Sequence, residues 1–191
     1  MSDNALAEYQ SKYVANKAFF SFLGNTFRIF DTSGGLQFYI KQKAFKLKEE
    51  INVFRDEAQT DKRLVIKAHG ISDFSGGYDI VDAQTGESVG GAKRQGLKSL
   101  FKDEWDILDK DGGLVGKILE TGGFMIFVRK FIKLIPQKYE VTLEGELAGT
   151  IHQRFNPFQL AYDVDFSHGK LDPRHAVGLV VLLLAIEGAD R

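Results

Sequence analysis

The chain is organised around one stretch near its C-terminal end, residues 172–188, which read DPRHAVGLVVLLLAIEG. Asp172 can accept hydrogen bonds from the first free amides of a helix, Pro173 suits the first helical position, and Gly188 suits the residue after the last. The stretch therefore predicts one capped helix over residues 173–187.

Between Ala176 and Ile186 this helix is apolar on every face, which excludes a position on the protein surface. About eleven residues at about 1.5 Å each extend only about 17 Å, roughly half of the hydrocarbon layer of a membrane. We therefore expect no transmembrane span, and a helix that is surrounded by the rest of the chain.

Length and composition limit the classes of protein that fit. The 191 residues suit a single domain with a substantial core. The formal net charge is −1 and both signs are mixed along the sequence, so no overall field attracts nucleic acid. The absence of cysteine excludes disulfides and thiolate chemistry. The first residues lack an apolar signal segment, so we expect a cytoplasmic protein.

Short segments with strand patterns fill most of the chain before the helix, whereas residues 1–18 are expected to form an arm or a short helix. Three segments begin with an aromatic residue and an acid, continue with a β-branched residue, and lead to a glycine turn. They start at Tyr78, Trp105 and Tyr139. Each predicts a β-hairpin whose aromatic face points inward and whose acids point outward.

Roughly a dozen short strands followed by one apolar helix predict a mainly β protein, a closed antiparallel β-barrel around the C-terminal helix. Strands of about six residues extend about 20 Å, which is close to the length of the helix. Because the helix fills the interior, we expect little room for a deep ligand pocket.

The sequence resembles the Tubby C-terminal-like superfamily, especially its LURP-one-related branch, and that superfamily also includes the phospholipid scramblases. The resemblance rests on the three aromatic hairpins and on residues 42–48, 162–166 and 185–188, and it covers most of the chain from about residue 19. It implies a twelve-stranded barrel domain over residues 19–191 with a central C-terminal helix. For function it implies little, because the LURP-one-related branch mostly has no assigned biochemistry; the expectation is a non-enzymatic binding module of this type. Tubby-type domains are known for phosphoinositide binding, and scramblase-like members for association with membranes.

Known catalytic and cofactor motifs do not match this sequence. The histidines stand singly, without a second ligand at metal-site spacing; they are His69, His152, His168 and His175. Residues 109–113 begin like a calcium loop but lack its later acids, so a turn is expected. Residues 91–99 nearly spell a phosphate loop, but Leu97 displaces Lys98 from the required position. We expect neither an enzyme nor a cofactor or metal.

Two basic clusters carry the hypothesis about a ligand. The first contains Lys41 and Lys43 on one strand face, joined by Lys46 and Lys48 if a β-bulge lies near residues 42–44. The second contains Arg129, Lys130 and Lys133, within an apolar stretch that includes Phe124 and Phe131. Together these residues are hypothesised to bind anionic phospholipid head groups, with the phenylalanines at the membrane interface.

Two other interpretations of these clusters remain open. The lysines can be the solvated outer face of ordinary strands, with the phenylalanines in the core. Alternatively, an exposed strand edge or residues 124–136 can serve a protein-binding scaffold that has no lipid ligand. The expected partner is therefore an anionic membrane lipid or a protein, and the expected location is cytoplasmic and peripheral at a membrane.

Overall fold

A computed structural model describes residues 8–18, 25–42, 50–68, 77–95, 104–122, 136–156 and 159–186. Within these ranges the chain forms twelve β-strands followed by one helix. They are β1 (Lys12–Ala18), β2 (Asn25–Phe30), β3 (Leu36–Gln42), β4 (Ile51–Phe54), β5 (Lys62–Ala68), β6 (Gly77–Asp82), β7 (Ser88–Arg94), β8 (Glu104–Leu108), β9 (Leu114–Thr121), β10 (Lys138–Leu143), β11 (Glu146–Arg154), β12 (Gln159–Asp165) and α3 (Pro173–Ile186).

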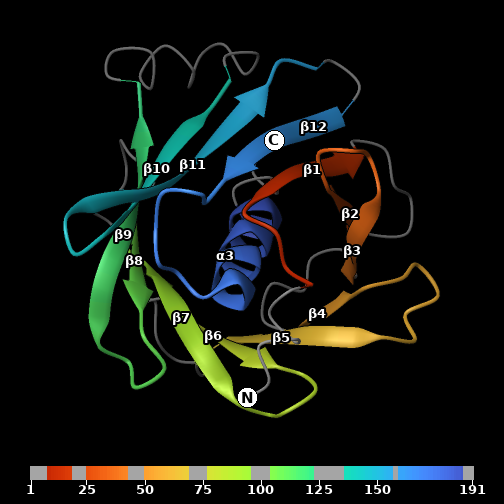
Figure 1. Cartoon of the computed structure of the whole chain (residues 1–191), viewed down its shortest axis with the longest axis horizontal. Coiled ribbons are helices and arrows are strands. Elements are labelled where there is room, and N and C mark those ends of the chain that lie inside the picture. The colour runs from red at the N-terminus through yellow and green to blue at the C-terminus, as the bar shows by residue number, and fades with distance from the viewer. Residues whose placement is uncertain are drawn as a thin grey trace.

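The strands form one closed barrel in which each strand pairs with its neighbours in sequence. The first and last strands, β1 and β12, pair antiparallel with Lys12 opposite Asp165, and this pairing closes the ring. Figure 1 shows α3 in the centre of the ring of strands. The predicted architecture, a closed antiparallel barrel around the C-terminal helix, is confirmed.

The central helix is buried over residues 174–186. Its start is as predicted, because the Asp172 side chain accepts a hydrogen bond of 2.9 Å from the Arg174 amide. Gly178 lets the helix approach β6 closely: a Cβ atom at this position would lie 2.6 Å from Cδ1 of Ile80. The predicted end of the helix at residues 187 and 188 lies outside the described residues.

The three predicted hairpins correspond to β6–β7, β8–β9 and β10–β11. Trp105 and Tyr139 point into the core and are 1% and 0% exposed, while Tyr78 is half-buried against Trp105. The prediction that the acids point outward is wrong for Asp82, which is buried. Asp82 faces a buried arginine on α3, a contact between residues far apart in sequence that a local pattern cannot show.

The N-terminal region differs from the expected arm or short helix, because residues 12–18 form strand β1 of the barrel. The inward-facing side chains of β1 are Tyr13, Ala15 and Lys17. Because Ala15 is small and Lys17 is charged, β1 lacks the alternation of large apolar and polar side chains that normally identifies a strand. The barrel therefore begins before residue 19, the boundary that the sequence suggested.

Candidate functional site

The barrel has two ends of different chemistry. We call the end at which α3 begins the proximal end; its strands are joined by residues 31–35, 55–61, 83–87, 109–113 and 144–145, and residues 166–172 lead from β12 to α3. We call the other end the distal end; its strand ends are joined by residues 19–24, 43–50, 69–76, 95–103, 122–137 and 155–158.

The sequences of these two sets of connections carry opposite charge. The proximal set contains nine acids and three bases: Asp31, Asp56, Glu57, Asp61, Glu87, Asp109, Asp111, Glu144 and Asp172, against Arg55, Lys110 and Lys170. The distal set contains four acids and eight bases: Glu49, Glu50, Asp73 and Asp103, against Lys43, Lys46, Lys48, Lys98, Lys102, Arg129, Lys130 and Lys133. The two sets of connections thus differ in the sign of their charge, although the whole chain is nearly neutral.

Of the nine residues predicted to bind lipid, only Lys41 lies within the described residues. It is exposed near the distal end of β3 and lies opposite Thr26 of β2. The other eight, as well as the proposed bulge, lie outside the described residues: Lys43, Lys46, Lys48, Phe124, Arg129, Lys130, Phe131 and Lys133.

The strands that lead to the two predicted clusters stand on opposite walls of the barrel. The first cluster follows β3 and the second follows β9, and these two strands are six places apart in the ring. Twelve strands about 4.8 Å apart give a barrel roughly 20 Å across. The described strands β3 and β9, which precede the two clusters in the sequence, therefore lie on opposite sides of the barrel.

Two distal residues of interest were missed by the sequence analysis. Lys138 is exposed at the start of β10, directly after the second basic segment, and lies opposite Thr121 and His152. Phe155 follows β11 and is 63% exposed. Lys138 could have been found from its position beside the basic segment, whereas the exposure of Phe155 has no signal in the sequence.

At the proximal end, the buried Arg174 joins the start of α3 to the barrel wall. Its Nη1 lies 2.9 Å from Oδ2 of Asp82 and its Nη2 lies 2.6 Å from Oδ2 of Asp172. Glu87 is more distant, at 3.7 Å from Nη1. Asp82 also accepts hydrogen bonds from the amides of Gln84 and Thr85 in the β6–β7 turn.

These contacts keep Arg174, Asp82 and Asp172 ionised. The hydrogen bond with Asp172 raises the pKa of Arg174, and the contact with Asp82 adds to this effect. Burial alone favours the protonated forms of Asp82 and Asp172, but hydrogen bonds from Arg174 and from backbone amides outweigh burial and lower both pKa values. The helix start is therefore anchored by a buried, charged arrangement.

His175 follows Arg174 and lies against the backbone of β7. Its Nε2 is 3.1 Å from the carbonyl oxygen of Gly91, and the side chain is 3% exposed. Gly90 makes room for the ring, because a Cβ atom there would lie 2.4 Å from the imidazole; its φ of +139° also favours glycine. Burial lowers the pKa of His175 and outweighs the opposing effect of the Gly91 carbonyl.

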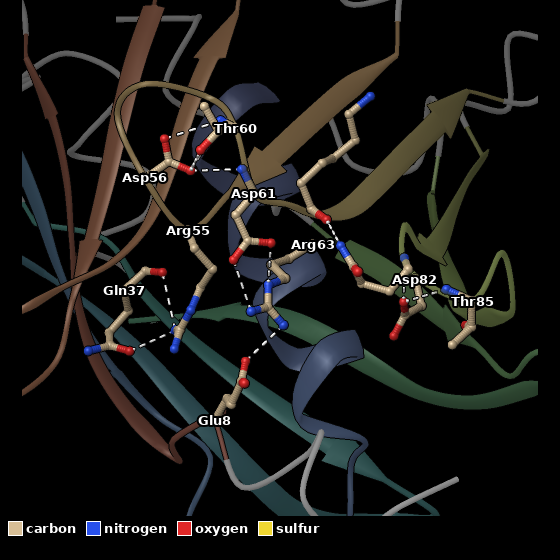
Figure 2. Close-up of polar contacts among 11 residues, drawn as sticks. Glu8, Gln37, Arg55, Asp56, Thr60, Asp61, Arg63, Asp82 and Thr85 are labelled. Atoms are coloured by element: carbon tan, nitrogen blue, oxygen red, sulfur yellow. Dashed lines mark hydrogen bonds and ion pairs between the residues drawn. The ribbon is translucent and has the colours of Figure 1, made fainter.

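The chain before β1 covers the part of the proximal end next to β3 and β5. Tyr9 stacks on Phe38 with 5.4 Å between ring centroids. Figure 2 shows the Arg63 guanidinium between the carboxylates of Asp61 and Glu8, at 2.9 and 2.8 Å. This part of the proximal end is therefore closed by the chain itself.

The remaining part of the proximal end contains a hollow of about 670 Å³ between β7 and the connection from β12 to α3. Apolar side chains that include Val115, Leu143 and Leu171 line it, together with several acids and His175. The expectation that the helix leaves little room for a pocket is therefore too strong at this end. Residues 109–113 form the expected turn at its edge, closed by a hydrogen bond of 2.8 Å from the Asp109 amide to the Gly113 carbonyl.

Among the described residues, no helix is both long enough and apolar enough to cross a membrane. In the same ranges, no three histidine, aspartate or glutamate side chains come together so as to hold a metal ion.

Comparisons with known proteins agree with this architecture. A family model described as LURP-one-related matches residues 11–184. The X-ray structure of a protein from Arabidopsis thaliana is similar in fold, with a TM-score of 0.54 and 13% sequence identity, over 97% of this chain and 96% of that one. No curated protein matches the sequence. Because the family model spans most of the barrel, the chain belongs to the LURP-one-related family.

Proposed function

We propose that this protein is a binding module whose distal end binds anionic phospholipid head groups at a membrane surface. Membership of the LURP-one-related family suggests a Tubby-like barrel with a binding role, and proteins of this family are generally not enzymes. The lipid and the distal site are the new parts of the proposal.

The observation that carries the proposal is the sequence of the connections between the distal strand ends, in which basic and aromatic residues concentrate. Eleven of the sixteen phenylalanines belong to the distal connections: Phe19, Phe20, Phe22, Phe45, Phe74, Phe101, Phe124, Phe127, Phe131, Phe155 and Phe158. The proximal connections contain one, Phe166. Bases that attract anionic lipid, combined with apolar side chains that enter the interface, are the composition that peripheral membrane binding requires.

The described distal residues support this orientation. Lys41 and Lys138 are exposed on opposite walls, and neither lies opposite an acid in the strand register. Phe155 is exposed near β12 at the same end. A membrane lying across the distal end can therefore contact these three side chains, while the acidic proximal end faces away from it.

The proposed site also includes the basic and aromatic residues named from the sequence. They are Lys41, Lys43, Lys46, Lys48, Arg129, Lys130, Lys133, Phe124 and Phe131. Each lysine or arginine near an anionic surface contributes about 1 kcal/mol to binding, so a set of this size is sufficient for salt-sensitive association. The proposed location is cytoplasmic and peripheral at the membrane.

Co-sedimentation with liposomes tests the proposal. We expect the protein to bind vesicles that contain phosphatidylserine or phosphoinositides, to bind neutral phosphatidylcholine vesicles much less, and to be released as salt rises to physiological strength. The variant K41E/K138E should bind at least about tenfold more weakly, because two favourable charges become unfavourable ones.

The matched control is K110E/K170E, which makes the same charge change at two exposed proximal lysines. This control should retain vesicle binding. Equal losses in both double variants would show that net charge, and not the distal end, determines binding. An absence of vesicle binding at low salt would overturn the lipid proposal and favour a protein partner, whose binding is expected to be insensitive to salt.

A further inference from the structure

The hollow at the proximal end has the size and lining of a ligand site. Its volume of about 670 Å³ lies within the range of roughly 300 to 1,000 Å³ that is typical of small-molecule pockets. Val115, Leu143 and Leu171 provide an apolar surface, and Leu147 adds a side chain that is 45% exposed. An apolar body of drug-like size can therefore be buried there.

An anionic ligand does not fit the polar groups of this hollow. The start of α3 could attract an anion. However, the Asp172 carboxylate already accepts a hydrogen bond from the Arg174 amide and occupies the place where an anion would bind. The Arg174 guanidinium is compensated by Asp82 and Asp172. Lys110 also lines the hollow, and its Nζ is paired at 3.0 Å with Asp111, which does not line it. Of the bases that line the hollow, Lys170 is the one for which the described residues offer no ion pair.

The acids that line the hollow nevertheless outnumber its lysines and arginines. Glu144 and Glu146 flank the tip of the β10–β11 hairpin, and within the described ranges their carboxylates have neither a hydrogen bond nor an ion pair. Glu87 lies 3.7 Å from Nη1 of Arg174 and, like Asp109, also attracts Lys110. With Asp109, four carboxylates at the edge of an apolar hollow favour a positively charged ligand. A bound metal ion is disfavoured because no three described ligands converge.

The buried His175 indicates which kind of cation fits. It lines the hollow, and its Nε2 is placed to donate to the Gly91 carbonyl. In that tautomer Nδ1 is an acceptor, and the part of the chain that the structure describes offers it no donor. An N–H donor on the ligand satisfies this nitrogen, whereas a quaternary ammonium group cannot.

We propose that the proximal hollow binds a small amphiphilic amine, a protonated primary or secondary amine attached to an apolar body. The apolar body packs on Val115, Leu143 and Leu171, and the ammonium group donates to Nδ1 of His175 and is attracted by the acids that line the hollow. This inference is independent of lipid binding, because the two sites lie at opposite ends of the barrel.

The test uses three probes of the same shape and different charge: 4-phenylbutylamine, 4-phenylbutanol and 4-phenylbutyrate. Binding to the full chain is followed by two-dimensional amide NMR and by calorimetry. The amine should bind best, and the signals that shift should belong to the β10–β11 turn, the β8–β9 turn and the start of α3. Its N,N,N-trimethyl derivative should bind more weakly than the amine.

The variant E144Q/E146Q removes two carboxylates without changing their size, and it should raise the dissociation constant of the amine roughly fivefold. The dissociation constant of 4-phenylbutanol should stay the same. Glu57→Gln is the matched control, because it removes an acid of the same end that does not line the hollow. This control should leave amine binding unchanged.

Three results would overturn the inference: the alcohol or the carboxylate binding as tightly as the amine, amine-induced shifts located elsewhere, or no binding of the amine at millimolar concentration. Vesicle binding of E144Q/E146Q is measured in parallel. It should equal that of the unmodified protein, so failure of the amine site and failure of the lipid proposal can be told apart.

Discussion

The two ends of the barrel are built from the same twelve strands around the same helix, but the connections that join the strands at each end differ in sequence and charge. The proximal end has short, hydrogen-bonded turns, a surplus of acids, and a buried ionised group where Arg174 meets Asp82. The connections between the distal strand ends combine a surplus of bases with most of the phenylalanines.

This comparison shows that net charge is a poor guide to the binding properties of a barrel. A formal charge of −1 with both signs mixed along the sequence suggests a surface without a strong field. Successive connections in an antiparallel barrel alternate between the two ends, however. Acids of the proximal connections and bases of the distal connections therefore follow opposite ends of the strands, although they are mixed along the sequence.

The largest expected effect on stability comes from a substitution in the central helix α3. Leu182 lies in its middle and is 1% exposed, so Leu182→Asp places an unpaired charge at the barrel centre. We expect no folded, soluble protein, as measured by circular dichroism and gel filtration. Leu147→Asp, at a proximal position that is 45% exposed, is the control and should fold. A stable, soluble L182D protein would contradict the role assigned to the helix.

The next prediction concerns the anchor of the proximal end. Arg174→Met leaves Asp82 and Asp172 without their cation, and it should lower the free energy of unfolding by about 3 to 5 kcal/mol. Urea denaturation measures this change. Lys170→Met, an exposed neighbour, should change stability by less than about 0.5 kcal/mol. A loss below about 1 kcal/mol for R174M would mean that the buried ion group is not structural.

A change of pH is expected to have a smaller effect on the free energy of unfolding. Burial lowers the pKa of His175 in the folded state, so between that value and about 6.5 the unfolded chain binds more protons. Stability should therefore be full above about pH 6.5 and should fall below it, by up to about 1.4 kcal/mol per pH unit. The contributions of Asp82 and Asp172, whose pKa values are lowered, are lost only at more acidic pH.

Urea denaturation of His175→Gln between pH 7 and pH 5 tests this assignment. The slope of stability against pH should disappear in H175Q and persist in His168→Gln, a change at an exposed position of the same end. A slope that survives in H175Q would assign the titration to another group.

The smallest effect on stability is expected at the distal end. Phe155 is 63% exposed, so Phe155→Ser should change the free energy of unfolding by less than about 0.5 kcal/mol. Its binding to acidic vesicles should nevertheless weaken if this side chain enters the interface. Leu114→Ser, at a proximal residue that is 60% exposed, should leave vesicle binding unchanged. Equal vesicle binding by F155S and the unmodified protein would remove Phe155 from the proposed site.

Most of the fold could be predicted because it follows from local patterns in the sequence. A helix that is apolar on all faces requires an enclosing wall, and the alternation of Tyr162, Val164 and Phe166 marks a strand whether or not its partners are known. β1 could not be predicted in this way, because its inward face contains Ala15 and Lys17. Its strand identity comes from pairing with β12, which is distant in the sequence.

The candidate sites were less predictable, since they depend on which segments share an end of the barrel. The pairing of Asp82 with Arg174 joins the end of β6 to the helix start across 92 positions. Strand alternation places Asp82 on the same face as the buried Ile80, but no local pattern identifies the arginine that it meets. The hollow likewise arises from side chains of three connections. The basic clusters were visible as sequence, but their common end follows only from the strand order.

The closing pair of β1 with β12 has a consequence for how the chain folds. These two strands stand at opposite ends of the barrel sequence, so the ring closes only through contacts that are distant along the chain. Such contacts form late because the loop-closure entropy must be overcome first. Until they form, the sheet has two unpaired strand edges and an uncovered apolar face, so we expect aggregation to compete with folding before the ring closes.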